Sequence, residues 1–582
     1  HNNSAIQYAS KNGHTEIVKM LLADSRVDPS YNAIRFASEY GHTEIVRMLL
    51  EDSRVNPSRH NNSAIQYASK NGHTEIVKML LADPRVDPSN NAIRFASEYG
   101  HIEIVKMLLA DPRVDPSTNS NYAIQYASKN GHTEIVKMLL SDPRVNPSDS
   151  DPRDEHCYQK VARWYRDVAF RLACRHGQTA VVKVLLADSR IDPSSGYNEA
   201  IENASEYGHT EVVKMLLADP RVDPSVRNNY PIWIASKNGH VEIVKMLLAD
   251  LRVNPSDSYY DYNFQKSYDN AAIIFASQNG YAAIVQILLA DTRVDPSAVD
   301  NCAVIKASEN GHVDVVVMLL ADSRVDPSAC DNEAIKCASI KGHAEIVKML
   351  LADARVAPRD LNYVNNSQKR KRSGWCGNVA FRLACRNGKA AVVQELLADS
   401  RIDPSSDYNE AIKTASEYGH SEVVKLLLAD PRVNPCVCRN YAIQVASKYG
   451  HAAVVKILLE DSRVNPGACA SDWYQENAAI IYASEYGHKE VVEMLLGDDR
   501  VDPSVGDNYA IRKASENGHA EVVKMLLAHS RVDPSACENA AIRYAASNYH
   551  TEIVKMLSAD SRVDSRFGDV FYISNRPTNC HM

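Results

Sequence analysis

The sequence predicts an all-α solenoid of about 17 helix-turn-helix units joined by hairpin-like loops. A phrase such as AIQYASKNGHTEIVKMLLADSRVDPS, residues 5–30, returns seventeen times in varied form, most often at a step of 31 residues. Apolar residues recur at helical spacing inside each copy, and nearly every copy ends in a loop that contains proline. A fixed period of this size indicates one small unit per repeat, which is stable only when it stacks on its neighbours.

Each unit contains the signals for two helices. The first helix is predicted by small and apolar residues, which in the first copy are Ala5, Ile6 and Ala9. Gly13 then supplies the left-handed residue that ends this helix. The second helix opens at Thr15 and has an apolar stripe formed by Ile17, Val18, Leu21 and Leu22. Pro29 prevents it from continuing, because proline has no amide proton.

The spacing of the units predicts three blocks and a tail. Residues 1–148 hold repeats 1–5, and residues 149–358 hold repeats 6–11, with long insertions at 149–168 and 257–271. Residues 359–565 hold repeats 12–17, with insertions at 360–379 and 468–478, and residues 566–582 form a C-terminal tail. VAFRLACRHG at Val168 recurs as VAFRLACRNG at Val379, 211 residues later. The last two blocks are therefore homologous.

Within one unit the residues resemble the ankyrin repeat. Ser4 to Gln7, then Ala9 and Ser10, then Gly13 and His14, and then Glu16 to Leu21 match the pattern of that family. The loop differs, because Ala-Asp-Ser-Arg-Val-Asp-Pro-Ser replaces the glycine-containing family hairpin. The resemblance implies stacked helix pairs, a protein-binding role, and recognition through the concave face made by the first helices. It also implies that the histidine after the glycine forms a hydrogen bond across the turn.

Composition and motifs argue against several function classes. The net charge of −8 is mild for 582 residues, no apolar run reaches the roughly 18 residues that span a bilayer, and the 12 cysteines show no paired spacing. Histidines after the glycines lie in layers about 10 Å apart, too far for one metal ion. The sequence contains no nucleophile and base set unique to one repeat and no glycine-rich phosphate loop. We expect no catalytic residue, cofactor or metal.

The variable position six residues before each glycine is basic far more often than acidic. It carries eight basic residues and one acidic residue among Gln7, Arg35, Gln66, Arg94, Gln125, Arg171, Glu202, Trp233, Ile274, Ile305, Lys336, Arg382, Lys413, Gln444, Ile481, Arg512 and Arg543. A glutamate follows four residues later in four units, which favours helical ion pairs of Arg35, Arg94, Lys413 and Arg512. Such exposed ion pairs contribute little to stability, and their ordinary role is to keep the protein soluble.

Two units have a second cation in place of that glutamate. Arg171 is followed by Arg175, and Arg382 by Arg386. The insertions before them add Arg163, Trp164 and Arg166 in one block, and Lys369, Arg370, Lys371, Arg372 and Trp375 in the other. Arginine suits carboxylate or phosphate groups, and tryptophan adds an apolar anchor. These residues form the predicted partner site, together with Trp233 on the helix-one row and Trp473 in the last insertion.

The predicted function is that of a non-catalytic scaffold that binds another protein, with an acidic or mixed peptide surface, through the inserted loops and the helix-one face. Two alternatives stay open: an adaptor that recruits substrates to a modification or ubiquitination assembly, and association of nucleic acid with the arginine clusters. The inserted loops either bind a partner or fold back onto the array. We expect a monomer in the cytoplasm, without a membrane anchor or small-molecule substrate, and with nuclear import through Lys369 to Arg372 as a further option.

Overall fold

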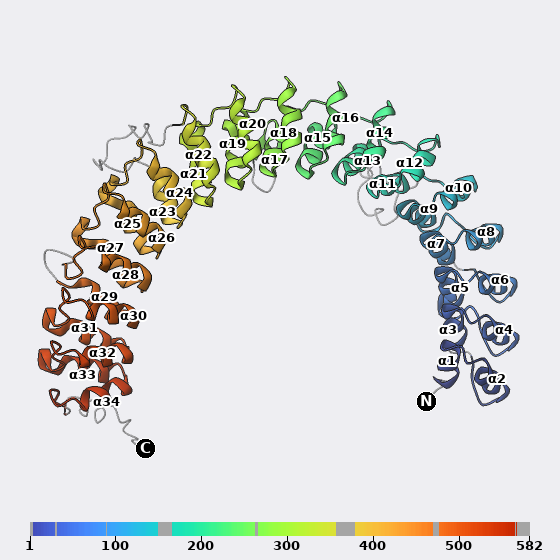
Figure 1. Ribbon diagram of the computed structural model, residues 1–582. Coiled ribbons are helices and arrows are strands. Elements are labelled where there is room, and N and C mark those ends of the chain that lie inside the picture. Colours follow the sequence, from blue (N-terminus) through green and yellow to red (C-terminus); the bar gives the residue numbers. More distant parts are fainter. Residues whose placement is uncertain are drawn as a thin grey trace, which may run out of the picture. The chain divides into compact units, whose positions relative to one another are not determined.

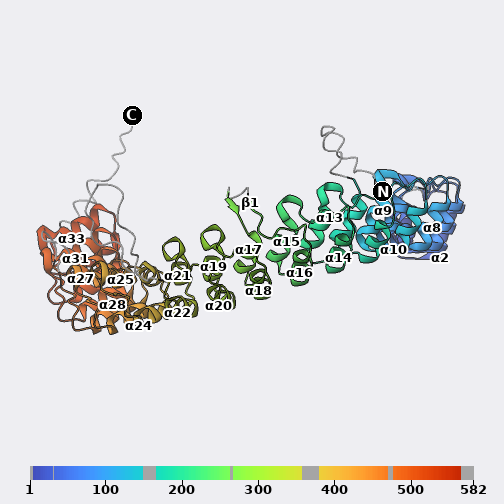
Figure 2. The ribbon, with the colours of Figure 1, turned by 90° about the horizontal axis from the view of Figure 1, so that it is seen from above.

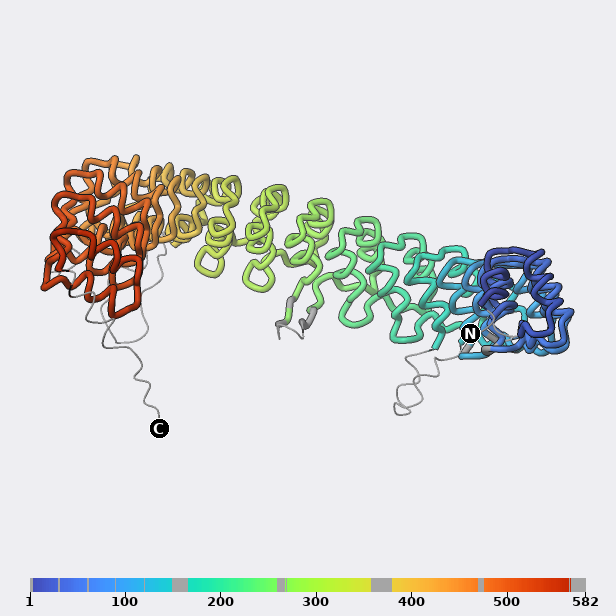
Figure 3. Tube along the Cα trace, turned by 90° about the horizontal axis from the view of Figure 1, so that it is seen from below, coloured from blue at the N-terminus to red at the C-terminus, as the bar shows by residue number. Residues whose placement is uncertain are grey.

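The computed structural model describes residues 4–29, 32–88, 90–148, 166–261, 266–356, 379–468, 476–564 and 566. The chain divides into two compact units, residues 1–276 with 281–295, and residues 277–280 with 296–582. Within each unit the chain passes from one helix pair to the next in sequence order (Figure 3). Figure 2 shows the odd-numbered helices in one row and the even-numbered helices in another, for example α13 and α15 beside α14 and α16.

The described residues form 34 helices, which are seventeen pairs, as predicted (Figure 1). The bounds are α1 Ser4–Lys11, α2 Thr15–Ala23, α3 Ala33–Tyr40, α4 Thr43–Glu51, α5 Arg59–Asn71, α6 Thr74–Ala82, α7 Asn90–Tyr99, α8 Ile102–Ala110, α9 Thr118–Asn130, α10 Thr133–Ser141, α11 Val168–Arg175, α12 Thr179–Leu186, α13 Ser195–Glu206, α14 Thr210–Ala218, α15 Val226–Asn238, α16 Val241–Ala249, α17 Ala271–Gln278, α18 Ala282–Ala290, α19 Ala298–Asn310, α20 Val313–Ala321, α21 Ala329–Lys341, α22 Ala344–Ala352, α23 Val379–Arg386, α24 Ala390–Ala398, α25 Ser406–Glu417, α26 Ser421–Ala429, α27 Val437–Lys448, α28 Ala452–Glu460, α29 Ala478–Glu485, α30 Lys489–Leu496, α31 Val505–Glu516, α32 Ala520–Ala528, α33 Ala536–Ser547 and α34 Thr551–Ser558. We call the surface of the odd-numbered helices the helix-one face.

The core runs between the two rows of helices and consists of the predicted stripe. In α4, Ile45, Val46 and Leu49 are at most 1% exposed, and every internal even-numbered helix buries the equivalent three side chains. Burial of one such side chain contributes about 1.5–3 kcal/mol, so stacking of neighbours accounts for most of the stability. Ile17 of α2 is 49% exposed, because the first pair packs against a described neighbour on one side only.

The predicted glycine ends helix one for two reasons. Gly208 has φ of 79°, in the left-handed region, as do its equivalents in the other repeats. A Cβ atom at Gly208 would also lie 2.6 Å from the ring of His240 in the following repeat. Tyr549 takes the same conformation, with φ of 61°, in the last repeat. Ser558 replaces a leucine of the other repeats and is exposed at the end of α34.

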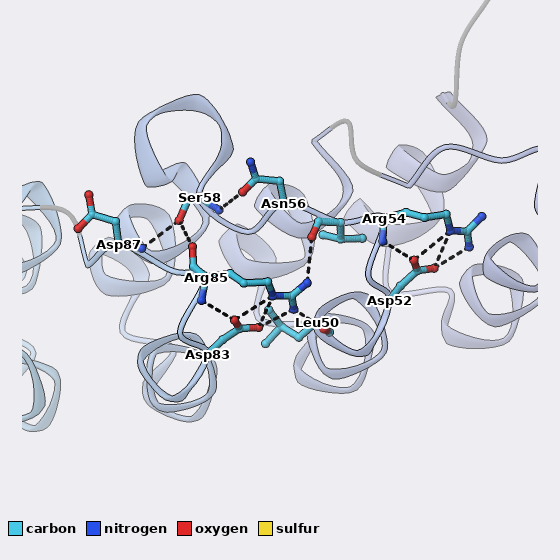
Figure 4. A network of polar contacts seen from close by, with 9 residues as sticks. Leu50, Asp52, Arg54, Asn56, Ser58, Asp83, Arg85 and Asp87 are labelled. Carbon is cyan, nitrogen blue, oxygen red and sulfur yellow. Dashed lines mark hydrogen bonds and ion pairs between the residues drawn. The ribbon is translucent and has the colours of Figure 1, made fainter.

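The connecting loops contain an arginine that ties each repeat to the one before it. Figure 4 shows that Arg85 donates to both carboxylate oxygens of Asp83, at 3.0 and 2.6 Å. The same guanidinium donates to the carbonyl oxygens of Val55 and Leu50 in the preceding repeat. Its equivalents are Arg54, Arg113, Arg144, Arg190, Arg252, Arg293, Arg355, Arg401, Arg432, Arg463, Arg500 and Arg562. We call this contact the arginine clamp.

Of the four insertions, the described part of 257–271 forms a short antiparallel hairpin, β1 Tyr259–Asp261 with β2 Lys266–Tyr268. Tyr259 pairs with Tyr268 in its register. Figure 2 shows β1 projecting beyond the odd-numbered helices. The other three insertions lie mainly outside the described residues, and so do Arg163, Trp164, Lys369 to Arg372, Trp375 and Trp473. Whether the inserted loops bind a partner or fold back stays a prediction.

Candidate functional site

The predicted arginine pairs lie on the helix-one face, but the first arginine of each pair is not free. Arg171 on α11 forms an ion pair with Glu199 on α13. Arg382 on α23 forms one with Asp407 on α25, at 2.8 Å. The prediction that these units escape neutralisation is therefore wrong for Arg171 and Arg382. The sequence did not show this because the acidic partner comes from the next repeat, 25 or 28 residues later.

The second arginine of each pair contacts an exposed tyrosine. Arg175 donates to the hydroxyl of Tyr207 at 3.0 Å, and its guanidinium lies 5.3 Å from that ring. Arg386 makes the same contacts with Tyr418, at the same two distances. The tyrosines are 44% and 46% exposed, so a ligand can reach both the aromatic ring and the cation. An aromatic ring orients the guanidinium that lies over it, so that its N–H groups can bind a planar anionic group such as a carboxylate.

These contacts make two copies of one cluster, 211 residues apart in the chain. The shared residues are Arg171, Arg175, Glu199, Glu206 and Tyr207 in the first copy, and Arg382, Arg386, Glu410, Glu417 and Tyr418 in the second. We call them the first and second Arg–Tyr clusters. They differ at Glu202, where the second copy has Lys413. Lys413 pairs with Glu410 at 2.6 Å, whereas Glu202 pairs with Arg227 at 3.1 Å.

A cavity of about 350 Å³ lies at the second cluster. Its lining consists of Val379, Arg382, Leu383, Arg386, Glu410, Thr414, Glu417 and Tyr418. Arginines, glutamates and the apolar side chains of Val379 and Leu383 share the lining, and the volume is large enough for one large side chain. The cavity can therefore take one residue of a protruding peptide.

In the first cluster, Glu202 is a buried carboxyl group. It is 5% exposed, and its Oε1 has no hydrogen-bond donor among the described residues. Burial raises the pKa of Glu202 to about 7, and the nearby Arg227 opposes this shift. The net charge of the first cluster therefore becomes more positive as pH falls through about 7, because Glu202 takes up a proton.

Trp233 is a buried residue of the helix-one row. It is 5% exposed and packs between Tyr230, at a ring distance of 4.6 Å, and Phe275, at 5.5 Å. Its large ring fills the space between adjacent helices, so this burial gives no support to Trp233 as a partner-binding residue, and that role stays a prediction. Arg166, the one predicted loop residue that the structure describes, is exposed and accepts a hydrogen bond from Arg171 through its carbonyl oxygen.

Two of the four predicted ion pairs within helices are present. Arg35 lies 3.5 Å from Glu39, and Arg94 lies 3.6 Å from Glu98. The other two predictions are wrong: Lys413 pairs with Glu410 instead of Glu417, and Glu516 pairs with Lys513 instead of Arg512. In each case a lysine and glutamate three residues apart form the shorter contact.

Sequence reasoning missed a row of aromatic rings beside Arg35 and Arg94. Arg35 lies between Phe36 and Tyr67, at 5.0 and 4.7 Å from the ring centres. Arg94 lies between Phe95 and Tyr126, at 4.8 and 4.9 Å. The alternation of Gln-Tyr and Arg-Phe pairs in successive repeats, from Gln7-Tyr8 to Gln125-Tyr126, is the signal that could have revealed it.

The histidines that follow the glycines have a structural role. His42 Nε2 lies 2.9 Å from the carbonyl oxygen of Lys11 in the preceding repeat, and the equivalent histidines make the same contact. The bond thus joins two repeats, instead of crossing one turn as the resemblance implied. Within the described part of the chain, no group of three or more His, Cys, Asp or Glu residues could hold a metal ion.

The cysteines of the described residues are free thiols. Cys174 and Cys385 are buried, and burial raises the pKa of both thiols, so neither is a reactive nucleophile. Among the helices that the structure describes, none is long and apolar enough to cross a bilayer.

The comparisons with known proteins agree with the fold. A family model described as ankyrin repeats (3 copies) matches residues 6–92, 93–197, 201–300, 273–360 and 414–507. No curated protein matched the chain. Proteins built from these repeats are typically non-catalytic and generally serve as modules for protein–protein interaction. The match covers well over half of the residues, and the paired helices, left-handed glycines and buried stripes are those that the repeat pattern predicts, so the chain belongs to the ankyrin repeat family.

Proposed function

We propose that this protein is a non-catalytic scaffold that binds an acidic or mixed peptide segment of another protein at its two Arg–Tyr clusters. The observation that carries the proposal is the duplicated contact of an arginine with an exposed tyrosine, Arg175 with Tyr207 and Arg386 with Tyr418. The cavity of about 350 Å³ at the second cluster supports it. Arginine and tyrosine are the residue types that most often dominate the binding energy of protein interfaces.

Within the two clusters, only some residues are available to contact a partner. Arg171 and Arg382 hold neighbouring repeats together through their ion pairs, so their loss would disturb the fold as well as binding. Arg175, Arg386 and the two tyrosines remain as the groups offered to a ligand. Glu206 and Glu417 directly precede the two tyrosines in the sequence and repel the regularly spaced phosphates of a nucleic-acid strand, whereas a peptide can place uncharged residues beside them.

Affinity capture from the native cell tests the proposal with three forms of the chain: the intact protein, Arg175→Ala/Arg386→Ala, and Lys214→Ala/Lys425→Ala. The lysines lie on α14 and α26, also 211 residues apart, and their loss changes the net charge equally. We expect the arginine variant to lose a set of proteins that the lysine variant retains. Retention of the same proteins by all three forms would show that the clusters are not the binding site.

The nucleic-acid alternative makes a different prediction. Binding through phosphate contacts weakens steeply between about 50 and 200 mM salt, because counterions are released. A peptide anchored on tyrosine is less sensitive to salt. Repeating the capture at both salt concentrations separates the two.

A further inference from the structure

We infer that Arg35 and Arg94 form a pair of anion-binding sites for one extended acidic polypeptide segment, on the helix-one face of repeats 1–5. This surface lies outside both Arg–Tyr clusters. The inference rests on the proposed function only in that the ligand is a polypeptide.

The two guanidinium groups contact aromatic rings but are poorly hydrogen-bonded. Each lies over two aromatic rings, at 4.7 to 5.0 Å from the ring centres. In each, Nε is buried without an acceptor among the described residues. The ion pairs with Glu39 and Glu98, at 3.5 and 3.6 Å, are longer than a normal charge-assisted hydrogen bond.

Arg382 and Arg512, at the same position of the repeat, also have a buried Nε without an acceptor among the described residues, but their outer nitrogens are hydrogen-bonded. Arg382 donates to Asp407 at 2.8 Å, and Arg512 donates to the carbonyl oxygen of Gly506 at 2.9 Å. Arg35 and Arg94 therefore have unused N–H donors, and their side chains remain 29% and 27% exposed. A carboxylate that approaches the outer nitrogens of the guanidinium would accept hydrogen bonds from them without breaking an existing hydrogen bond.

The charge of this surface suits an anionic ligand. The five helices α1, α3, α5, α7 and α9 contain six lysines and arginines, namely Lys11, Arg35, Arg59, Lys70, Arg94 and Lys129. They contain two acidic residues, Glu39 and Glu98. The net charge of the whole chain is −8, so this positive surface stands out against an acidic protein. It attracts carboxylates from a distance of about one Debye length, roughly 8–10 Å.

The spacing of the sites defines the kind of segment that fits. Arg35 and Arg94 lie on α3 and α7, two layers apart, because α5 packs against both. With 8–10 Å between packed helices, the two sites are on the order of 20 Å apart. An extended chain rises about 3.3 Å per residue, so carboxylates about six residues apart reach both guanidiniums. The half-buried rings of Phe36, Tyr67 and Phe95 line the path between them.

A polypeptide fits better than a nucleic acid. A nucleic-acid strand carries a phosphate about every 3.4 Å, which would place several phosphates beside Glu39 and Glu98. An acidic peptide can present carboxylates at the two arginines alone and place uncharged residues beside the glutamates.

Fluorescence anisotropy with the purified full chain tests the inference. The probe is a fluorescein-labelled peptide of about twelve residues, made of glycine, serine and tyrosine with two glutamates about six positions apart. We expect Arg35→Gln/Arg94→Gln to weaken binding by about tenfold or more, since two charge-assisted contacts are lost. Replacement of both peptide glutamates by glutamine should have a similar effect on the intact chain.

The matched control is Arg47→Gln/Lys106→Gln, on α4 and α8 of the same two repeats. These side chains are exposed and pair with Glu44 and Glu103, at 3.3 and 2.7 Å. Their loss changes the net charge equally and should alter the affinity by less than about twofold. Equal weakening by both double variants would overturn the inference, because the attraction would then be non-specific. So would equal binding of the glutamate and glutamine peptides.

Two further measurements complete the test. If Arg35→Gln/Arg94→Gln does not fold, Arg35→Lys/Arg94→Lys keeps the charge but lacks the planar fork, and we expect about threefold to tenfold weaker binding. A labelled oligouridylate that binds more tightly than the peptide, and depends on Arg35 and Arg94, would overturn the assignment to a polypeptide. None of these results depends on Arg175 or Arg386, so failure here is distinct from failure of the proposed function.

Discussion

Arginine at one position of the repeat makes two different kinds of contact in this chain. Arg171 and Arg382 bind an acidic residue of the next repeat and hold adjacent helices together. Arg35 and Arg94 stack between aromatic rings and keep unused donors. The residues of the next repeat that lie beside the arginine decide which role applies. Single-residue predictions must therefore be made with the adjacent repeats in view.

The buried Glu202 should make the folding stability of the protein depend on pH. Its pKa is raised to about 7 by burial, so the folded state binds a proton more tightly than the unfolded state. Stability should therefore fall as pH rises from the ordinary glutamate value of about 4.3 through 7. Glu202→Gln removes this dependence, and we expect the variant to be more stable than the parent by roughly 1–3 kcal/mol at pH 8. Thermal unfolding at pH 5 and pH 8 measures the difference.

The difference between parent and Glu202→Gln should become small at pH 5, where the parent carboxyl group is protonated. Lys413→Gln is the matched control, because it occupies the equivalent position of the second Arg–Tyr cluster. A parent protein whose advantage over Glu202→Gln grows with pH would contradict the assignment of a buried, poorly solvated carboxylate.

Trp233→Ala should unfold the protein more easily. The indole is 5% exposed between two aromatic neighbours, so its removal leaves a large cavity and costs about 3–5 kcal/mol. Urea denaturation checks the value. Trp233→Phe should cost much less, and an unchanged midpoint for the alanine variant would mean that the ring is not part of the core.

At the scale of the helix pair, the sequence was sufficient for most of the fold. The left-handed glycine, the small residues of helix one and the Ile-Val-Leu stripe are local signals, and each is found as predicted. The arginine clamp was missed, because Asp and Arg two residues apart resemble ordinary solvated surface charges. Only the structure shows that Arg113 donates hydrogen bonds to the carbonyl oxygens of Leu81 and Val86 in the preceding repeat. The recurrence of Asp-x-Arg in almost every loop was the available signal.

Arg113→Gln tests the clamp. The variant loses an ion pair with Asp111 and two hydrogen bonds, at 2.8 and 2.9 Å, to the preceding repeat. We expect a loss of about 1–2 kcal/mol at neutral pH in urea denaturation, reduced from the full value because the side chain is partly exposed. Arg47→Gln, an exposed arginine on α4, should cost less than about 0.5 kcal/mol.

The clamp should weaken in acid. The Arg113 guanidinium holds the pKa of Asp111 below its usual value, so the stabilisation is complete above about pH 4 and is lost as pH falls through the lowered pKa. The difference between the parent and Arg113→Gln should therefore shrink below pH 4. A difference that stays constant from pH 7 to pH 2 would show that the ion pair contributes nothing.

At the scale of the whole molecule, the proposed function depends on a surface repeated along the chain. Each Arg–Tyr cluster belongs to its own unit, and repeats 1–5 add the pair formed by Arg35 and Arg94. The sequence located the clusters through the 211-residue duplication, but it could not show that half of their arginines form ion pairs with an acidic residue of the next repeat. The acidic partners of those arginines are set by the packing of neighbouring layers, which no local pattern encodes.

The most direct test of the central claim is photo-crosslinking of captured partner proteins. A photoreactive p-benzoylphenylalanine is placed on the helix-one face in Tyr418→p-benzoylphenylalanine, or on the opposite row of helices in Lys425→p-benzoylphenylalanine. The account predicts crosslinks to the partner from position 418 and few or none from position 425. Crosslinks from position 425 alone would contradict it, because recognition would then take place on the even-numbered helices.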